Sequence, residues 1–263
     1  MLTRESKVNS INRSAAPKFD LTRRQFINGS LASLGLYGIT GLSNFVLADE
    51  PNDFDEVTRF LQTGKSRVPY VTLTEDGPAY PPAEIPWLSD FTAVGGKGNL
   101  PEGQLVYLFG QILDAKGRPI PGSVVEIWQA DTHGTYKHPT WPGQKNLDPN
   151  FGYFGKVKTG QDGSYMFKTI IPRPYSILGI TRAPHIHLKM KHANHGVLTT
   201  SLYFEGKEDD QIREKDVVWQ SAPRPTRDHL IMARQSPKKF ADLNIAFEEN
   251  AVCCKSNLAF LMG

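Results

Sequence analysis

The chain has 263 residues, of which 39% are hydrophobic, 22% are charged and 10% are aromatic. This composition is that of a folded globular protein and excludes a chain that is disordered throughout. The formal net charge is +3, but six basic and only two acidic side chains lie in residues 1–48. The remaining residues are therefore nearly neutral, and they contain no basic run. This distribution argues against a nucleic-acid partner.

Residues 1–48 have the order of an export signal. Arg23 and Arg24 precede an uncharged run from Gln25 to Ala48 that is rich in glycine and serine and ends in a small-residue cleavage pattern. The segment resembles a twin-arginine export signal. We therefore expect the twin-arginine machinery to export the chain to the periplasm or the cell exterior, with a mature start near Asp49. Two alternatives stay open: an uncleaved membrane anchor, for which the run is long enough, and a chance match.

Residues 49–104 are polar and rich in proline, which predicts an irregular N-terminal arm. From residue 105 to the end, short apolar segments alternate with turn signals and show little helical periodicity, so we expect one domain that is an all-β sandwich with long loops. The segment 132–160 is predicted to be one long loop, and loops of that length are usually functional. The predicted strands cover residues 105–113, 123–129, 165–170, 185–190, 198–204, 229–233 and 243–248.

One of these predicted strands alternates between apolar and histidine side chains. Ile186, Leu188 and Met190 are expected to face an apolar layer, which places His185 and His187 on the opposite face, about 6.6 Å apart at about 3.3 Å per residue. Two imidazoles at this spacing can bind one metal ion, but two histidines on the wet face of a strand show the same pattern. A zinc hydrolase would need further ligands, and no third histidine or carboxylate stands at a telling spacing.

Two tyrosines near these histidines are candidate metal ligands. Tyr136 lies in a glycine-containing corner after the strand predicted at 123–129, and Tyr175 lies between Pro174 and Ser176. A phenolate is a hard oxygen ligand, and a trivalent metal can lower the phenol pKa of about 10 enough to ionise it. Taken singly, each tyrosine is better explained by packing in a core or a turn.

Several blocks of sequence, in order and spacing, resemble the intradiol ring-cleaving dioxygenases. Two further blocks are most similar to the protocatechuate 3,4-dioxygenase branch, and the resemblance covers roughly residues 100–250. It implies cleavage of a catechol-type ring between its two hydroxyl-bearing carbons by O2, which gives a muconate-type dicarboxylate. The first blocks are Pro119–Asp131, Gly134–Tyr136, Pro172–Tyr175 and Arg182–His187, and the further two are Leu147–Gly152 and Leu202–Gly206.

The resemblance also implies a metal and its ligands. It implies one non-haem Fe(III) per chain, held by two tyrosinates and two histidines, with an aromatic diol and O2 as the reacting partners. Tyr175 would be the ligand that the substrate displaces. The implied ligand set is Tyr136, Tyr175, His185 and His187.

Other implied roles concern the substrate. Arg182 would stabilise negative charge beside the substrate ring, although its position alone favours a surface arginine at the start of a strand. Tyr80, in the segment Gly77–Pro81, resembles the family's arm over the substrate. Ile177 stands where protocatechuate enzymes carry tryptophan, and Ser201 stands where the family usually has glutamine. Both positions line or approach the pocket in the family, so these smaller side chains imply a wider pocket here.

Two other functions remain open at this stage. One is a non-catalytic exported β-sandwich that binds a ligand or a partner, and the other is an enzyme that uses copper or zinc. Neither explains the positions of the tyrosines. The adjacent Cys253 and Cys254 exclude a CxxC-type zinc site, while a vicinal disulfide, two thiols and an intermolecular link stay open. The sequence does not decide between a monomer and a homo-oligomer.

Overall fold

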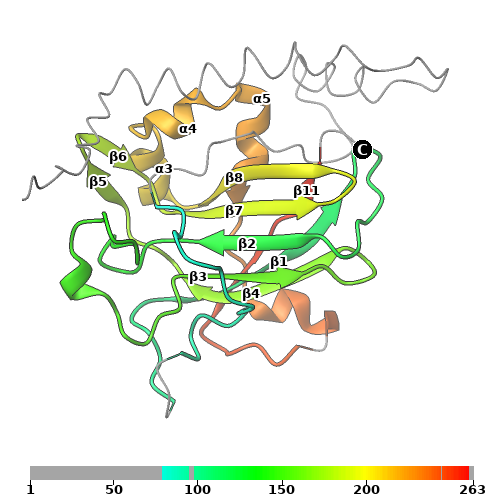
Figure 1. Cartoon of the computed structure of the whole chain (residues 1–263), viewed down its shortest axis with the longest axis horizontal. Coiled ribbons are helices and arrows are strands. Elements are labelled where there is room, and N and C mark those ends of the chain that lie inside the picture. Colours follow the sequence, from blue (N-terminus) through cyan, green and yellow to red (C-terminus); the bar gives the residue numbers. More distant parts are fainter. Residues whose placement is uncertain (1–78, 95–97, 244, 261–263) are drawn as a thin grey trace, which may run out of the picture.

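A computed structural model describes residues 79–94, 98–243 and 245–260 (Figure 1). The predicted export signal and the first part of the predicted arm lie outside these residues. Residues 79–94 and 98–104 form no helix or strand and touch the sheets through isolated bridges, from Trp87 to Lys156 and from Asp90 to Lys168. In the described ranges, no helix is both long and apolar enough to cross a membrane.

Short strands make up most of the regular structure, and a few short helices follow β8. The strands are β1 Leu105–Leu113, β2 Val124–Trp128, β3 Phe154–Lys158, β4 Ser164–Ile170, β5 Tyr175–Ile177, β6 Ile180–Arg182, β7 His185–His192, β8 Gly196–Phe204, β9 Ile231–Met232, β10 Val252–Lys255 and β11 Leu258–Ala259. The helices are α3 Lys207–Arg213, α4 Val217–Ser221 and α5 Arg224–Arg227, with 3-10 turns at Gln144–Asn146, Asp228–Leu230 and Pro237–Leu243.

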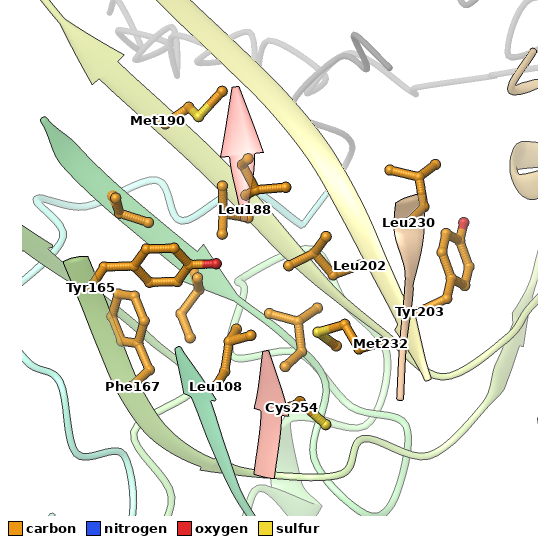
Figure 2. Close-up of a cluster of buried hydrophobic side chains, with 14 of the residues drawn as sticks. Leu108, Tyr165, Phe167, Leu188, Met190, Leu202, Tyr203, Leu230, Met232 and Cys254 are labelled. Carbon is orange, nitrogen blue, oxygen red and sulfur yellow. The ribbon is translucent and has the colours of Figure 1, made fainter. Parts of the chain in front are cut away.

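Nine of the strands form two sheets that face each other, and β5 and β6 form a separate two-stranded hairpin. In the first sheet, β1 pairs with β4 antiparallel and with β10 and β11 parallel. The second sheet has the order β3-β2-β7-β8-β9, and only its β8–β9 pair is parallel. Figure 2 shows Leu108 and Phe167 of the first sheet in one buried cluster with Leu188 and Leu202 of the second. The structure therefore has the predicted all-β sandwich.

The alternation predicted for residues 185–190 is present in β7. Ile186, Leu188 and Met190 are fully buried in the core between the sheets. His185 and His187 therefore lie on the outer face of the second sheet, because successive side chains of a strand point to opposite faces. Burial of the apolar face fixes this register, since a slip by one residue would turn the histidines into the apolar core between the sheets.

Two predicted boundaries are wrong. The segment 132–160 is not one loop, because β3 lies within it and pairs with β2. Residues 245–248 form no strand, and the strands near the C-terminus are β10 and β11 instead. Phe247 explains the second error. Its ring packs against Tyr107 with a centroid distance of 4.8 Å, so an apolar loop residue covering β1 imitates the pattern of a strand.

Strand pairing brings three side chains of the outer face together. Trp128 of β2 is opposite His187 of β7, and His187 is in turn opposite Ser201 of β8. The short β5–β6 hairpin places Tyr175 opposite Arg182. In Figure 1 this hairpin extends beyond the end of the second sheet, beside α3 and α4. The candidate site is built where these elements meet.

Candidate metal centre

The structure brings the four predicted ligands together. The Tyr136 hydroxyl lies 3.3 Å from His185 Nε2 and 3.5 Å from the Tyr175 hydroxyl. The Nε2 atoms of His185 and His187 are 3.1 Å apart. Two ligand atoms about 2.0 Å from one ion, at a tetrahedral angle, lie about 3.3 Å from each other. The spacing of these oxygen and nitrogen atoms is therefore that of donors sharing one ion.

Both histidines are held in the form that binds a metal. His185 donates its Nδ1–H to the Ala183 carbonyl at 2.6 Å, which leaves the Nε2 lone pair facing the site. The Nδ1 atom of His187 lies 3.4 Å from the Ser201 hydroxyl. Burial, followed by the Arg182 charge, holds the pKa of each imidazole well below its usual value, so both rings are neutral. The contact between the two Nε2 atoms would therefore be satisfied by a cation that both of them bind.

The tyrosines require the same cation to ionise. Burial raises the pKa of Tyr136 well above 10, and the neighbouring Tyr175 raises it further. Burial also raises the pKa of Tyr175, against the opposing charge of Arg182. Among the described residues, no group of three or more His, Cys, Asp and Glu side chains could hold a metal ion. An ion at this site would therefore use phenol oxygens, and a trivalent ion fits because it can ionise both of them.

Aromatic rings that the sequence analysis did not single out surround the ligands. Trp128 stacks on His187, with ring centroids 4.8 Å apart and planes 5° from parallel. Trp141 packs edge-on against Tyr136 at 4.7 Å and against Tyr175 at 5.0 Å. These contacts limit rotation of the ligand rings. The alternation within β2 predicts the face on which Trp128 lies. Only the pairing of β2 with β7 shows that the same face carries His187.

Arg182 is not a surface arginine. Its side chain is 7% exposed, and its Nε lies 3.2 Å from both carboxylate oxygens of Asp216. Its Nη2 donates to the Tyr203 hydroxyl at 3.3 Å. Sequence reasoning missed Asp216, whose available signal was an acidic residue directly before a helix: its side chain accepts the N–H groups of Val218 and Trp219 at the start of α4.

The three predicted pocket residues have different surroundings. Tyr80 donates its hydroxyl to Glu126 at 2.9 Å, its ring packs edge-on against Trp128 at 4.9 Å, and Lys189 Nζ lies 4.5 Å above that ring. The arm thus reaches the outer face of the second sheet. Ile177 is partly buried and packs against the cluster around Trp128. Ser201 is buried and touches an imidazole ligand, so its hydroxyl orients that ring.

Comparison with known proteins identifies the family of this chain. The model of a family described as dioxygenase matches residues 76–249. The protocatechuate 3,4-dioxygenase beta chain of Burkholderia cepacia is 34% identical over 146 residues, which are 54% of this chain and 61% of the relative. Catechol 1,2-dioxygenase 1 of Acinetobacter lwoffii is 31% identical over 138 residues, which are 47% of this chain and 41% of the relative.

A solved structure shares the fold. Catechol 1,2-dioxygenase from Acinetobacter sp. ADP1 superposes with a TM-score of 0.55 at 22% identity, over 91% of this chain and 78% of that one. The chain matches less than two thirds of the length of the two curated relatives above. The family match nevertheless covers well over half of this chain, including all four candidate ligands. The chain therefore belongs to the intradiol ring-cleavage dioxygenase family.

Proposed function

We propose that this chain is a non-haem Fe(III) dioxygenase that cleaves a catechol-type ring between its two hydroxyl-bearing carbons with O2, giving a muconate-type dicarboxylate. The observation that carries the proposal is the convergence of two phenol oxygens and two imidazole nitrogens, with neighbouring donors 3.1–3.5 Å apart. Membership of the intradiol family supports it, and an exported binding protein without a metal has no use for this donor set.

The ion would be held by Tyr136, Tyr175, His185 and His187. Two phenolates and one hydroxide balance the charge of Fe(III), so the loaded site is neutral and can be buried without a large desolvation cost. When bound, the ion supplies a Lewis acid and a template that binds the diol and activates it towards O2. Trp128, Trp141 and their neighbours keep bulk water from these atoms.

Tyr175 is the residue suited to receive a proton. It is partly buried and lies on a short two-stranded hairpin, whereas Tyr136 is 2% exposed. The Tyr175 phenolate oxygen can take up one proton of an arriving diol, and Arg182 in the paired strand holds a positive charge beside it. That guanidinium is also placed to stabilise negative charge that develops on the diol and its ring.

The test is to purify the protein, load it with Fe(III) and follow its reaction with aromatic diols. We expect a red-brown colour from charge transfer between tyrosinate and iron, about one iron per chain, and a product that contains both atoms of O2. Catechol, protocatechuate and hydroxyquinol should be compared, because Ile177 and Ser201 predict a pocket wider than that of protocatechuate enzymes. A protein that stays colourless after iron loading would contradict the proposal, and His185→Ala serves as the control without a complete ligand set.

A further inference from the structure

We propose that Asp216 is the positioning residue that holds Arg182 at the metal centre; this inference rests on the proposed function. Asp216 is completely buried and lies between α3 and α4, 34 residues after the arginine that it contacts. Figure 1 shows α3 and α4 beside β6, the strand that ends at Arg182. Asp216 is therefore brought to the site by the tertiary fold and belongs to none of the ligand-bearing segments.

The first contact neutralises a buried charge. The Nε of Arg182 lies 3.2 Å from each oxygen of the Asp216 carboxylate, and both side chains are buried. A buried guanidinium without a counter-ion is strongly unfavourable. Tyr203 takes a second N–H of the guanidinium, at 3.3 Å. The contacts with Asp216 and Tyr203 fix the orientation of the Arg182 guanidinium, and its positive charge acts on Tyr175.

The second contact fixes the backbone that carries a ligand. The Asp216 Oδ2 atom accepts the Ala183 N–H at 3.0 Å, and the carbonyl of Ala183 accepts His185 Nδ1–H at 2.6 Å. The same carboxylate thus holds the arginine and, through one peptide unit, the first histidine ligand. This arrangement ties the position of the cation to the position of the ligand ring.

The carboxylate is in turn anchored by a helix. Asp216 Oδ1 accepts the N–H groups of Val218 at 2.9 Å and Trp219 at 3.1 Å, which cap the start of α4. A cap alone needs a single side-chain oxygen, which serine or asparagine supplies equally well. Here both oxygens are used: Oδ1 carries the two cap contacts, Oδ2 accepts the Ala183 N–H, and the Arg182 Nε lies 3.2 Å from each of them. The asymmetry makes a selective substitution available.

The Asp216→Asn substitution is expected to keep the helix cap and to weaken the hold on the arginine, because a neutral amide with one acceptor oxygen replaces the carboxylate that balances the guanidinium. The remaining oxygen can still accept from Val218 and Trp219, while the new amide N–H₂ meets the N–H groups of Arg182 and Ala183. We expect the single-turnover rate of ring cleavage to fall by about 10- to 100-fold. This loss is smaller than the loss expected when Arg182 itself is removed, because the donor is misplaced but still present. Iron content should stay near one per chain, because none of the four ligands is altered.

A double-mutant cycle separates positioning from a general effect on the fold. In an Arg182→Ala background, Asp216→Asn should change the rate by less than about threefold, since the arginine is gone and only the contact with the Ala183 N–H is left to be disturbed. The same rate loss in both backgrounds would overturn the proposal, as would a rate in the single variant within about threefold of the parent. If the asparagine variant does not fold, Asp216→Ser, which keeps a capping hydroxyl, passes through the same cycle.

Thermal unfolding of the iron-free protein gives a readout that does not need activity. We expect Asp216→Asn to lower the midpoint by about 6–15 °C, and by less than half as much when Arg182 is already alanine, because no buried cation is then left unpaired. Equal shifts in both backgrounds would overturn the proposal. A parent chain that cleaves no aromatic diol would refute the proposed function, while this cycle would still report on the pairing.

Asp114→Asn is the matched control. Asp114 is also buried, and its carboxylate accepts from the Arg118 side chain at 2.6 Å and from the backbone N–H groups of Lys116 and Arg118. It lies in the turn between β1 and β2. The chain enters β2 at Val124, and Trp128, which stacks on a candidate ligand, lies at the other end of that strand. Its substitution should lower the midpoint without changing the rate measured well below that midpoint. A rate loss equal to that of Asp216→Asn would overturn the proposal.

Discussion

Tyr136 and Tyr175 present the same chemical group to the candidate metal centre in different surroundings. Tyr136 is almost completely buried against Trp141, and its hydroxyl contacts both Tyr175 and His185. Tyr175 is more exposed and begins a strand of three residues. A ligand that is to leave the metal has to turn towards solvent, and Tyr175 is the more exposed of the two tyrosines.

The first prediction therefore separates the two tyrosines. Tyr175→Phe should keep iron, lose much of the charge-transfer band and slow the chelation of substrate, because the phenolate that accepts a diol proton is absent. Tyr136→Phe should weaken iron retention more, since this ligand would stay bound throughout. Iron content and stopped-flow absorbance check both variants. Equal loss of iron and equal loss of rate in the two would contradict the assigned roles.

The second prediction concerns Arg182. Arg182→Ala should keep iron, colour and diol binding but lose about 10²–10³ in turnover, the usual effect of removing one preorganised donor. Arg182→Lys should recover only part of the loss, because an ammonium lacks the planar fork that contacts both Asp216 and Tyr203. Single-turnover kinetics with iron measured in the same sample checks this. Turnover of the alanine variant within about threefold of the parent would remove Arg182 from the mechanism.

At the scale of elements, the β5–β6 hairpin is the most strained part of the site. Its two connecting residues, Leu178 and Gly179, have φ values of 52° and 76°, and the flanking Ile177 and Ile180 are paired. A two-residue turn with positive φ at both positions favours Asn-Gly, and leucine is a poor choice for the first. Leu178 is 76% exposed, so packing does not compensate for this conformation.

Leu178→Asn is therefore predicted to stabilise the protein by about 1 kcal/mol, because asparagine tolerates the left-handed conformation. Urea unfolding of the iron-free protein measures the change. Val197→Asn is the control: it removes a similarly exposed side chain, 58% accessible, at a position of β8 that does not have a positive φ. A gain no larger than that of the control would show that strain at Leu178 is not the cause.

At the scale of the whole molecule, the sandwich separates the core from the chemistry. Apolar side chains of β1, β4, β7 and β8 fill the space between the sheets, and the histidine ligands lie on the outer face of the second. Cys253 and Cys254 likewise lie on opposite faces of the first sheet. They are consecutive in β10 and completely buried, Cys254 in the core (Figure 2) and Cys253 in the cluster with Tyr107. Because consecutive strand residues face opposite sides, the two thiols are free and form no vicinal disulfide.

The last prediction concerns the location of the chain. Residues 1–48 lie outside the described structure, and we propose from their sequence alone that they direct export by the twin-arginine route. Changing both Arg23 and Arg24 to lysine should leave the protein in the cytoplasm, because that route requires the arginine pair. Cell fractionation with an antibody against the catalytic domain measures the distribution. Unchanged export of the double variant would contradict the signal assignment.

The sequence by itself determined the features that depend on neighbouring residues. The two-residue period of β7 predicted which side chains are buried and which face outward, and β1 begins and ends at the predicted residues. The order and spacing of the sequence blocks around Tyr136, Tyr175 and His185 indicated the ligand set through resemblance. Such patterns are local, so they can be recognised before any strand finds its partner.

The tertiary structure alone decided which distant segments meet. It placed Trp128 against His187, brought Asp216 to Arg182, put β3 inside a segment predicted to be a loop, and used Phe247 to cover β1 instead of forming a strand. These outcomes depend on strand order, register and the packing of loops against sheets. Contacts of this kind join residues tens of positions apart, and local periodicity carries no information about them.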